Sequence, residues 1–211
     1  MNDFNIYDVL DEYMPQEQEI TDCYASEHWT AVETPSGMGI VLTTQGFDCR
    51  RFAAINAFYN HGEMWREPFE KYYTDGVDFT GKTVGVVGHL GGIGSHHGHE
   101  VKKLYYFDIH PKTPEDLPPE LEDEILPQCD IAVITGSSIV NQTLPHLLEL
   151  CRNAYVILTG PSVPRCPALL DCGIDRLAGM CVTDVPGLRK AIQSNTVGNP
   201  YPFGEPFIIS K

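Results

Sequence analysis

Residues 83–88 read TVGVVG, a short apolar strand that ends at a glycine. Three further apolar runs follow it: KLYYFD at 103–108, IAVIT at 131–135 and YVILT at 155–159. Nearly uninterrupted apolar runs of this length are typical of strands that are buried on both faces of a parallel sheet. The second half of the chain is therefore expected to fold as a Rossmann-like α/β domain with a mainly parallel sheet.

The segments between and after these strands carry helix signals. Helices are expected at residues 143–152 and 186–193, with a shorter one around 168–170. Asp184 precedes a helix that starts with proline, which makes it a natural N-cap. The tail at 201–211 contains two prolines and several aromatic residues, and it is expected to pack as an extended segment.

A smaller α+β unit is expected before residue 83. Apolar positions in residues 4–14 follow helical spacing, and residues 29–34 and 39–43 flank a Pro-Ser-Gly turn that predicts a β-hairpin. A second helix is expected at 51–61, just before a glycine.

A polar and aromatic connector rich in proline and glycine separates this unit from the first strand of the α/β half. The predicted domains are residues 1–78 and residues 79–211.

The composition excludes several partners. The 211 residues include 14 Lys and Arg against 29 Asp and Glu, and the resulting net charge of −15 repels nucleic acids and anionic lipid surfaces. No apolar run reaches the roughly 18 residues of a membrane span, and the N-terminus lacks a signal sequence. Seven scattered cysteines without a CxxC pair indicate reduced thiols in the cytoplasm. A homodimer is expected because two-fold oligomers are the commonest.

The loop after the first strand, GVVGHLGGIGSHHGH at 85–99, is rich in glycine. Glycine lets backbone amides approach a ligand closely, commonly a phosphate, and the candidates for ligand contact are Gly88, Gly91, Gly92 and Gly94. The loop lacks the G-x-G-x-x-G spacing of dinucleotide sites. Asp108, however, closes the second strand about 20 residues after Gly88, where Rossmann-type proteins hold a ribose. A nucleotide cofactor thus stays open.

Four of the eight histidines lie in or beside this loop: His89, His96, His97 and His99. Neutral imidazoles bind transition metals such as nickel, cobalt, zinc or iron, and a loop can turn neighbouring side chains toward one point. Their spacing matches no closed structural zinc site. The two alternatives to metal binding are that these histidines are solvated loop residues or that they act in acid/base catalysis.

Two more loops follow buried strands and carry small polar residues. Parallel strands share one carboxyl edge, so these loops are expected to line a single crevice there. Helix capping by Ser137, Ser138 and Asn141 is the alternative role. The candidate contacts are Thr135, Gly136, Ser137, Ser138, Asn141 and Thr143 after the third strand, and Gly160, Pro161 and Ser162 after the fourth.

Residues 130–184, DIAVITGSSIVNQTLPHLLELCRNAYVILTGPSVPRCPALLDCGIDRLAGMCVTD, resemble the family named "putative heavy-metal chelation domain", a domain of unknown function. The preceding half, with AAINA at 53–57, resembles the enolase-N-terminal-like unit that accompanies it. The resemblance implies a Rossmann-like domain, metal chelation and a link to anaerobic corrinoid or metal metabolism. The loop at 88–99 departs from the family because it looks shorter and richer in histidine.

These observations predict a small-ligand-binding protein that holds a metal or metal chelate in the crevice at the carboxyl edge, with the four histidines as metal ligands. The competing hypothesis is a transferase or lyase that acts on a small anionic or nucleotide-bearing substrate in the same crevice. A purely structural or dimer-forming module is a third. No G-x-S-x-G, H-E-x-x-H or P-loop motif marks catalytic residues.

Overall fold

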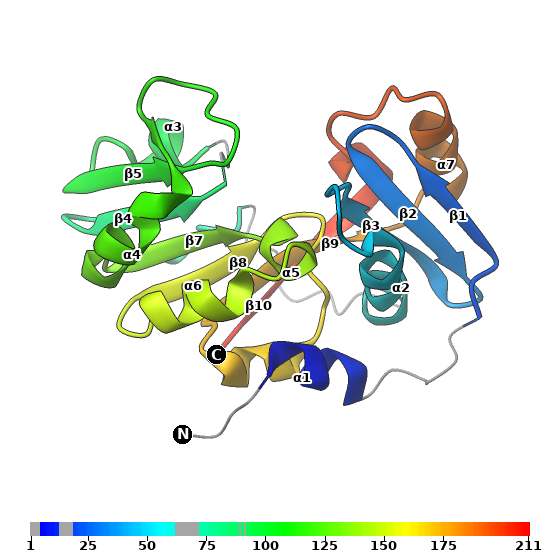
Figure 1. Cartoon of the computed structure of the whole chain (residues 1–211), viewed down its shortest axis with the longest axis horizontal. Coiled ribbons are helices and arrows are strands. Elements are labelled where there is room, and N and C mark those ends of the chain that lie inside the picture. Colours follow the sequence, from blue (N-terminus) through cyan, green and yellow to red (C-terminus); the bar gives the residue numbers. More distant parts are fainter. Residues whose placement is uncertain (1–4, 13–18, 62–71, 89, 91) are drawn as a thin grey trace.

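The computed structural model describes residues 5–12, 19–61, 72–88, 90 and 92–211. Within these residues the chain forms a seven-stranded sheet and a three-stranded sheet with helices packed around them (Figure 1). The predicted α/β class with a mainly parallel sheet is confirmed.

The small sheet has the order β1-β2-β3 and is antiparallel. It consists of β1 (Asp22–Ala25), β2 (Trp29–Thr34) and β3 (Gly37–Leu42), so the expected hairpin is confirmed. The two helices of this part are α1 (Ile6–Glu12) and α2 (Cys49–Tyr59). Residues 4, 13 and 14 of the predicted first helix lie outside the described residues. Helix α2 lies against β3 so closely that a Cβ atom on Gly39 would be 2.0 Å from the carbonyl oxygen of Ala53.

The large sheet has the order β10-β9-β8-β7-β4-β5-β6, and only β10 is antiparallel. Its strands are β4 (Thr83–Val87), β5 (Lys103–Phe107), β6 (Asp116–Leu117), β7 (Ile131–Thr135), β8 (Tyr155–Thr159), β9 (Arg176–Val182) and β10 (Gly204–Ser210). The four strands expected from the apolar runs are therefore present. The tail, expected only to be extended, pairs with β9 as β10.

Helices cover both faces of the large sheet. The α-helices of this half are α3 (Ile93–His97), α4 (Glu122–Ile125), α5 (Ser137–Val140), α6 (Leu144–Leu150) and α7 (Val185–Gln193), and the 3₁₀ helices are Pro119–Leu121, Leu126–Gln128, Pro167–Cys172 and Tyr201–Phe203. One face packs on α5 and α6 through Ile134 and Leu158. The other packs on α3 and Phe79 through Val84 and Val133. Burial on both faces explains why the strands are apolar without alternation.

Helix α7 belongs to the second half of the sequence but packs on the small sheet. Leu188 and Ile192 contact Trp29, Met38 and Ile40 on the face opposite α2. The small sheet is therefore enclosed by a helix from each half of the chain, and the division at 78/79 stays a prediction.

Two side chains hold the middle and the start of α7. Arg189 binds the Glu33 carboxylate through two nitrogens, at 2.6 and 2.8 Å. Asp184 caps the helix by accepting the Gly187 N–H at 2.9 Å, as predicted.

Two buried amides on α2 join the halves. The Asn60 side chain, 4% exposed, donates to the carbonyl oxygens of Val163 (2.9 Å) and Met180 (3.1 Å) and accepts the Arg165 N–H (2.6 Å). Asn56 donates to the Ile40 carbonyl at 2.8 Å and, in the other half of the chain, to the Pro161 carbonyl at 3.5 Å. Among the described residues, no helix is long and apolar enough to cross a bilayer.

Replacing Asn60 with alanine should destabilise the fold by about 3 kcal/mol or more. The substitution leaves one buried N–H and two buried carbonyl groups without their partner, and each unsatisfied group costs about 1–3 kcal/mol. Urea unfolding measures the change. Asn153→Ala is the matched control because Asn153 is exposed on a turn, and it should stay within about 0.5 kcal/mol of the wild type. Equal unfolding midpoints for both variants would contradict the role of Asn60.

The contact between α4 and α6 should depend on pH through Glu122. Burial, assisted by Asp123 and Glu120, raises the pKa of Glu122 to about 7, although His146 lowers it. Because the folded pKa exceeds the usual value near 4.5, this carboxyl favours the folded state below pH 4.5, and that contribution is lost as the pH rises through 7. Glu122→Gln should therefore become more stable relative to the wild type between pH 5 and pH 8. Thermal unfolding at both pH values, repeated in a His146→Gln background, tests this.

Candidate functional site

The carboxyl ends of β5, β4, β7 and β8 lie side by side in that order. In the register, Val87 is opposite Ile134 and Thr135 is opposite Thr159. From β4 the chain continues to β5 on one side of β4, and it later returns to form β7 on the other side of β4. Open α/β sheets bind ligands at such a reversal of strand order, outside the carboxyl ends. The loops after Gly88, Thr135 and Thr159 therefore share the edge where the sequence placed them.

Gly88 is in direct contact with β7. Its φ is +86°, and a Cβ atom there would be 2.9 Å from Cγ2 of Thr135. The Gly88 N–H donates to the Phe107 carbonyl at 2.7 Å, which ties the turn to β5 as well. Both the backbone conformation and the close approach therefore require glycine here.

The hydroxyl groups after β7 bond one another and the strand end. The Thr135 and Ser137 hydroxyl oxygens are 3.1 Å apart, and both residues are half-buried. Ser138 is buried and donates to the Thr135 carbonyl at 2.7 Å. Neither serine caps α5 with its side chain, so the capping alternative is wrong for them. Helix α5 spans a single turn, and the hydroxyl groups bond back to β7 instead.

The loop after β8 contacts the N-terminal part of the chain. Ser162, 4% exposed, accepts the Leu42 N–H at 2.9 Å, and the Pro161 carbonyl accepts from Asn56 at 3.5 Å. Gly160 is buried, and Gly136 packs so closely on this loop that its Cβ would be 2.7 Å from Val163. This predicted ligand loop therefore binds β3 and α2.

Asn141 and Thr143 follow α5 and bond each other. The Thr143 N–H and hydroxyl donate to the Asn141 side-chain oxygen at 3.2 and 2.8 Å. Asn141 thus shapes the turn that precedes α6, and it does not bond a first-turn amide of α5 or α6. The structure gives no bond from this pair to Gly88 or Thr135.

Asp108 directly follows β5, and Gly88 directly follows the adjacent β4, whose last residue Val87 pairs with Phe107. One carboxylate oxygen of Asp108 accepts the His110 N–H at 2.8 Å, and the Asp108 N–H donates to the Leu117 carbonyl at 3.1 Å. In Rossmann-type proteins an acid at the end of this strand binds a ribose.

The glycine-rich loop leads into α3. Gly92 precedes the helix with φ at +104°, and the Gly94 N–H donates to the Tyr106 hydroxyl at 2.9 Å. A first-turn amide that would be available to a phosphate is therefore already bonded within the protein. Gly91 and His89 lie outside the described residues.

His97 is fixed by packing. Its ring nitrogens lie 2.5 Å from a Glu100 carboxylate oxygen and 2.9 Å from the Thr74 hydroxyl, and its ring stacks on Phe79 at 4.2 Å. Thr74 and Phe79 precede β4, so His97 lies toward the amino end of that strand. Both nitrogens that could bind a metal are occupied by protein partners.

His96 and His99 are exposed. A Cβ atom on Gly92 would be 3.9 Å from Nδ1 of His96, and the His96 ring meets Tyr72 edge to face at 5.1 Å. Within the described part of the chain, no three His, Cys, Asp or Glu side chains converge as metal ligands. The residues present fit a metal that brings its own donor atoms better than a bare ion.

Five of the seven thiols are poor candidates for ligands of a soft metal. All seven cysteines are free, and five of them are buried. Burial raises the pKa of Cys129 to about 11 and of Cys151 to about 12, and it raises those of Cys166, Cys172 and Cys181 as well. Because the thiolate is the form that binds metals, these groups stay protonated and inert near neutral pH.

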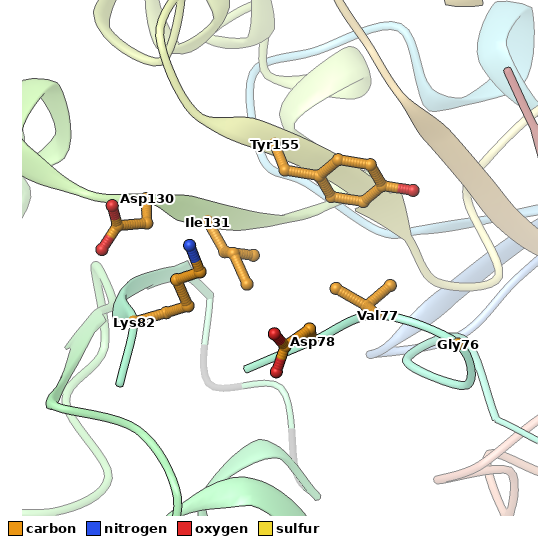
Figure 2. Close-up of a pocket in the computed structure, with 7 residues that line it drawn as sticks. All are labelled: Gly76, Val77, Asp78, Lys82, Asp130, Ile131 and Tyr155. Atoms are coloured by element: carbon orange, nitrogen blue, oxygen red, sulfur yellow. The ribbon is translucent and has the colours of Figure 1, made fainter. Parts of the chain in front are cut away.

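Sequence reasoning missed a cavity at the opposite, amino-terminal edge of the sheet (Figure 2). Its lining comes from residues 76–78, 82, 130–131 and 155. The only signal in the sequence was that charged residues stand immediately before two predicted strands, and such positions are common on protein surfaces.

A family model described as "Putative heavy-metal chelation" (DUF364) matches residues 76–201. The chain is also 33% identical over 86 residues to an uncharacterized protein of Methanocaldococcus jannaschii. That match covers 39% of this chain and 33% of the relative, so it spans about a third of the relative's length.

Two solved structures of DUF364 proteins with unknown function are similar over nearly the whole chain. The one from Desulfitobacterium hafniense is 25% identical with a TM-score of 0.84, covering 98% of this chain and 97% of its own. The one from Pyrococcus horikoshii is 19% identical with a TM-score of 0.79, covering 97% of each chain, and it supports the fold alone. Because the family model spans more than half of the sequence, this chain belongs to the DUF364 family.

Proposed function

We propose that this protein binds a metal chelate at the carboxyl edge of the large sheet. The switch-point site, as we call it, comprises Gly88, Asp108, Thr135 and Ser137. The observation that carries the proposal is the reversal of strand order between β4 and β7, with Gly88 and Thr135 in contact. In sheets of this kind the crevice outside such a reversal receives the ligand. The family's description supplies the metal.

The number of available donors favours a chelate over a free ion. Transition metals take four or more ligands. Among the described histidines of the predicted set, His97 is held by Thr74 and Glu100, and His96 and His99 are exposed. An organic chelator that fills most positions leaves one or two for imidazole, which this chain can supply.

His96 is the best-placed ligand because its ring lies beside Gly92 in the loop after β4. The half-buried hydroxyl groups of Thr135 and Ser137 would donate to anionic groups of the chelator. His89 stays in the predicted ligand set, outside the described residues. Which of nickel, cobalt, zinc or iron is bound, and any role in corrinoid or metal metabolism, belong to the same proposal.

A second candidate is an enzyme, a transferase or lyase, acting on a nucleotide-bearing or other small anionic substrate. The placement of Asp108 beside Gly88 favours it. The bond from the Gly94 amide to Tyr106 weighs against a phosphate at α3. The chelate therefore remains the leading candidate.

Three further expectations belong with this proposal: a homodimer, a cytoplasmic location and kinship of the N-terminal part with enolase N-terminal domains. The seven free cysteines support a reducing compartment. Two-fold symmetry is the commonest form of oligomer.

Nickel nitrilotriacetate, which leaves two coordination positions open, should bind the untagged protein and lose at least about tenfold in affinity in His96→Ala. Removing one coordinating imidazole typically has an effect of about this size or larger. Calorimetric titration measures it. Nickel EDTA, with no position open, should bind much more weakly.

His97→Ala is the control for this experiment. It should lower the unfolding midpoint because it removes contacts to Thr74, Glu100 and Phe79, and it should change nickel affinity little. Unchanged binding in a His96→Ala/His99→Ala variant would rule out these imidazoles as ligands.

Thr135→Val combined with Ser137→Ala should weaken the same chelate by about a hundredfold or more, because a hydrogen bond to a charged acceptor contributes about 1.5–3 kcal/mol and two are removed. Thr143→Val removes an exposed hydroxyl outside the switch-point site and serves as the matched control. Equal losses in both variants would argue against binding at the reversal.

A further inference from the structure

The cavity at the amino-terminal edge measures about 240 Å³. It lies between residues 76–78 and the starts of β4, β7 and β8, at the end of the sheet opposite the switch-point site. Figure 2 shows charged side chains on one side of it and Val77 and Tyr155 on the other. Pockets that bury drug-sized ligands measure about 300–1,000 Å³. This smaller one suits a single small metabolite.

The apolar lining comes from three residues. Ile131, 3% exposed, forms part of the sheet face, and Val77 and Tyr155 are half-buried beside it. An apolar group of a ligand would cover these side chains and gain the usual stabilisation of burial.

Asp130 is a rigidly mounted anion. Its carboxylate accepts the Thr83 N–H at 2.7 Å, its own N–H donates to the Thr83 carbonyl, and its carbonyl accepts from Tyr155. Three bonds thus fix the residue between β4 and β8. The carboxylate cannot easily move away to meet a distant partner, so its position is set before any ligand arrives.

Asp78 is fixed in a similar way, because it accepts the Thr80 N–H at 3.0 Å. The hydrogen bonds from Thr80 lower the pKa of Asp78, and Lys82 lowers it further. Asp78 therefore stays ionised at neutral pH. Two anchored carboxylates, both of them exposed to solvent, therefore border one cavity.

Lys82 supplies the opposite charge. Its backbone is held by bonds to Phe79, Lys102 and Lys103, and Figure 2 shows its side chain between Asp78 and Asp130. Among the described carboxylates, none lies within 4 Å of its ammonium group as an ion pair. The cavity thus presents one cation and two anions as separate charges.

These charges favour a ligand that carries both signs. A ligand with a carboxylate alone would meet two fixed anions, and like charges brought together are unfavourable. A ligand with an amine alone could pair with the aspartates but would leave Lys82 without a partner. A ligand that carries both groups can pair its ammonium with the aspartates and its carboxylate with Lys82.

We propose that this cavity binds a free apolar α-amino acid, with its ammonium group at Asp78 and Asp130, its carboxylate at Lys82 and its side chain on Val77, Ile131 and Tyr155. The site is independent of the switch-point site. A substitution that abolishes ligand binding at one edge of the sheet should leave ligand binding at the other edge unchanged.

The test uses three probes with the same apolar body: L-phenylalanine, 2-phenylethylamine and 3-phenylpropanoate. We expect saturable binding of L-phenylalanine with a Kd of about 1 mM, and at least about tenfold weaker binding of the other two. Chemical-shift titration of the full chain measures all three and locates the shifts.

Lys82→Met keeps the aliphatic stem and removes the ammonium group. It should weaken the binding of L-phenylalanine and strengthen the binding of 2-phenylethylamine. A purely structural effect of the substitution would not change the two affinities in opposite directions. Asp78→Asn should instead weaken the binding of L-phenylalanine and strengthen the binding of 3-phenylpropanoate.

Lys102→Met is the matched control, since Lys102 is exposed and does not line the cavity. It should leave all three affinities unchanged. The proposal is overturned if L-phenylalanine shows no saturation up to about twenty times the expected Kd, if the three probes bind equally, or if Lys82→Met shifts them in the same direction.

Discussion

The buried amide of Asn60 is the contact on which the arrangement of this molecule depends. It bonds the loop after β8 at two points and β9 at a third, from a helix that otherwise packs on the small sheet. An amide buried at this depth must satisfy its hydrogen-bonding groups, and the only partners here are on the other half of the chain. The position of α2 is therefore tied to the carboxyl edge of the large sheet. The bond from Leu42 to Ser162 follows the same seam and closes the last loop of that edge against β3.

The two edges of the large sheet consequently differ in chemistry. At the carboxyl edge the strand ends turn through glycine and hydroxyl residues, which offer neutral donors near Gly88 and Thr135. At the amino edge, charged residues stand at the strand starts and surround a small cavity. A parallel sheet keeps these edges apart by the length of its strands, about 3.3 Å per residue. Two ligands of different charge can therefore be bound without competing for the same groups.

The family name suggests a soft metal, and soft metals are usually bound by thiolates. Here five of the cysteines are buried in the core, and burial raises the pKa values of Cys129 and Cys151, which favours their protonated form. The histidines divide in a similar way. His97 is held by Thr74 and Glu100 and helps to attach α3, whereas His96 and His99 face solvent. Among the described residues, this distribution supports the proposal of a chelate over that of an ion alone.

The sequence by itself determined four strands of the large sheet, β4, β5, β7 and β8, and the edge at which they end. Apolar runs and the glycine after β4 are local signals. The rules for connecting parallel strands then indicate which of these strands lie side by side. It also indicated the α2 helix and the cap at Asp184. Only the tertiary structure decided the roles of the polar side chains. Ser162 bonds Leu42, 120 positions away, and the cavity gathers residues from 76 to 155. A serine or histidine carries the same local signal whether it caps, packs or binds, because its partner is set by contacts that form when distant segments meet in the fold.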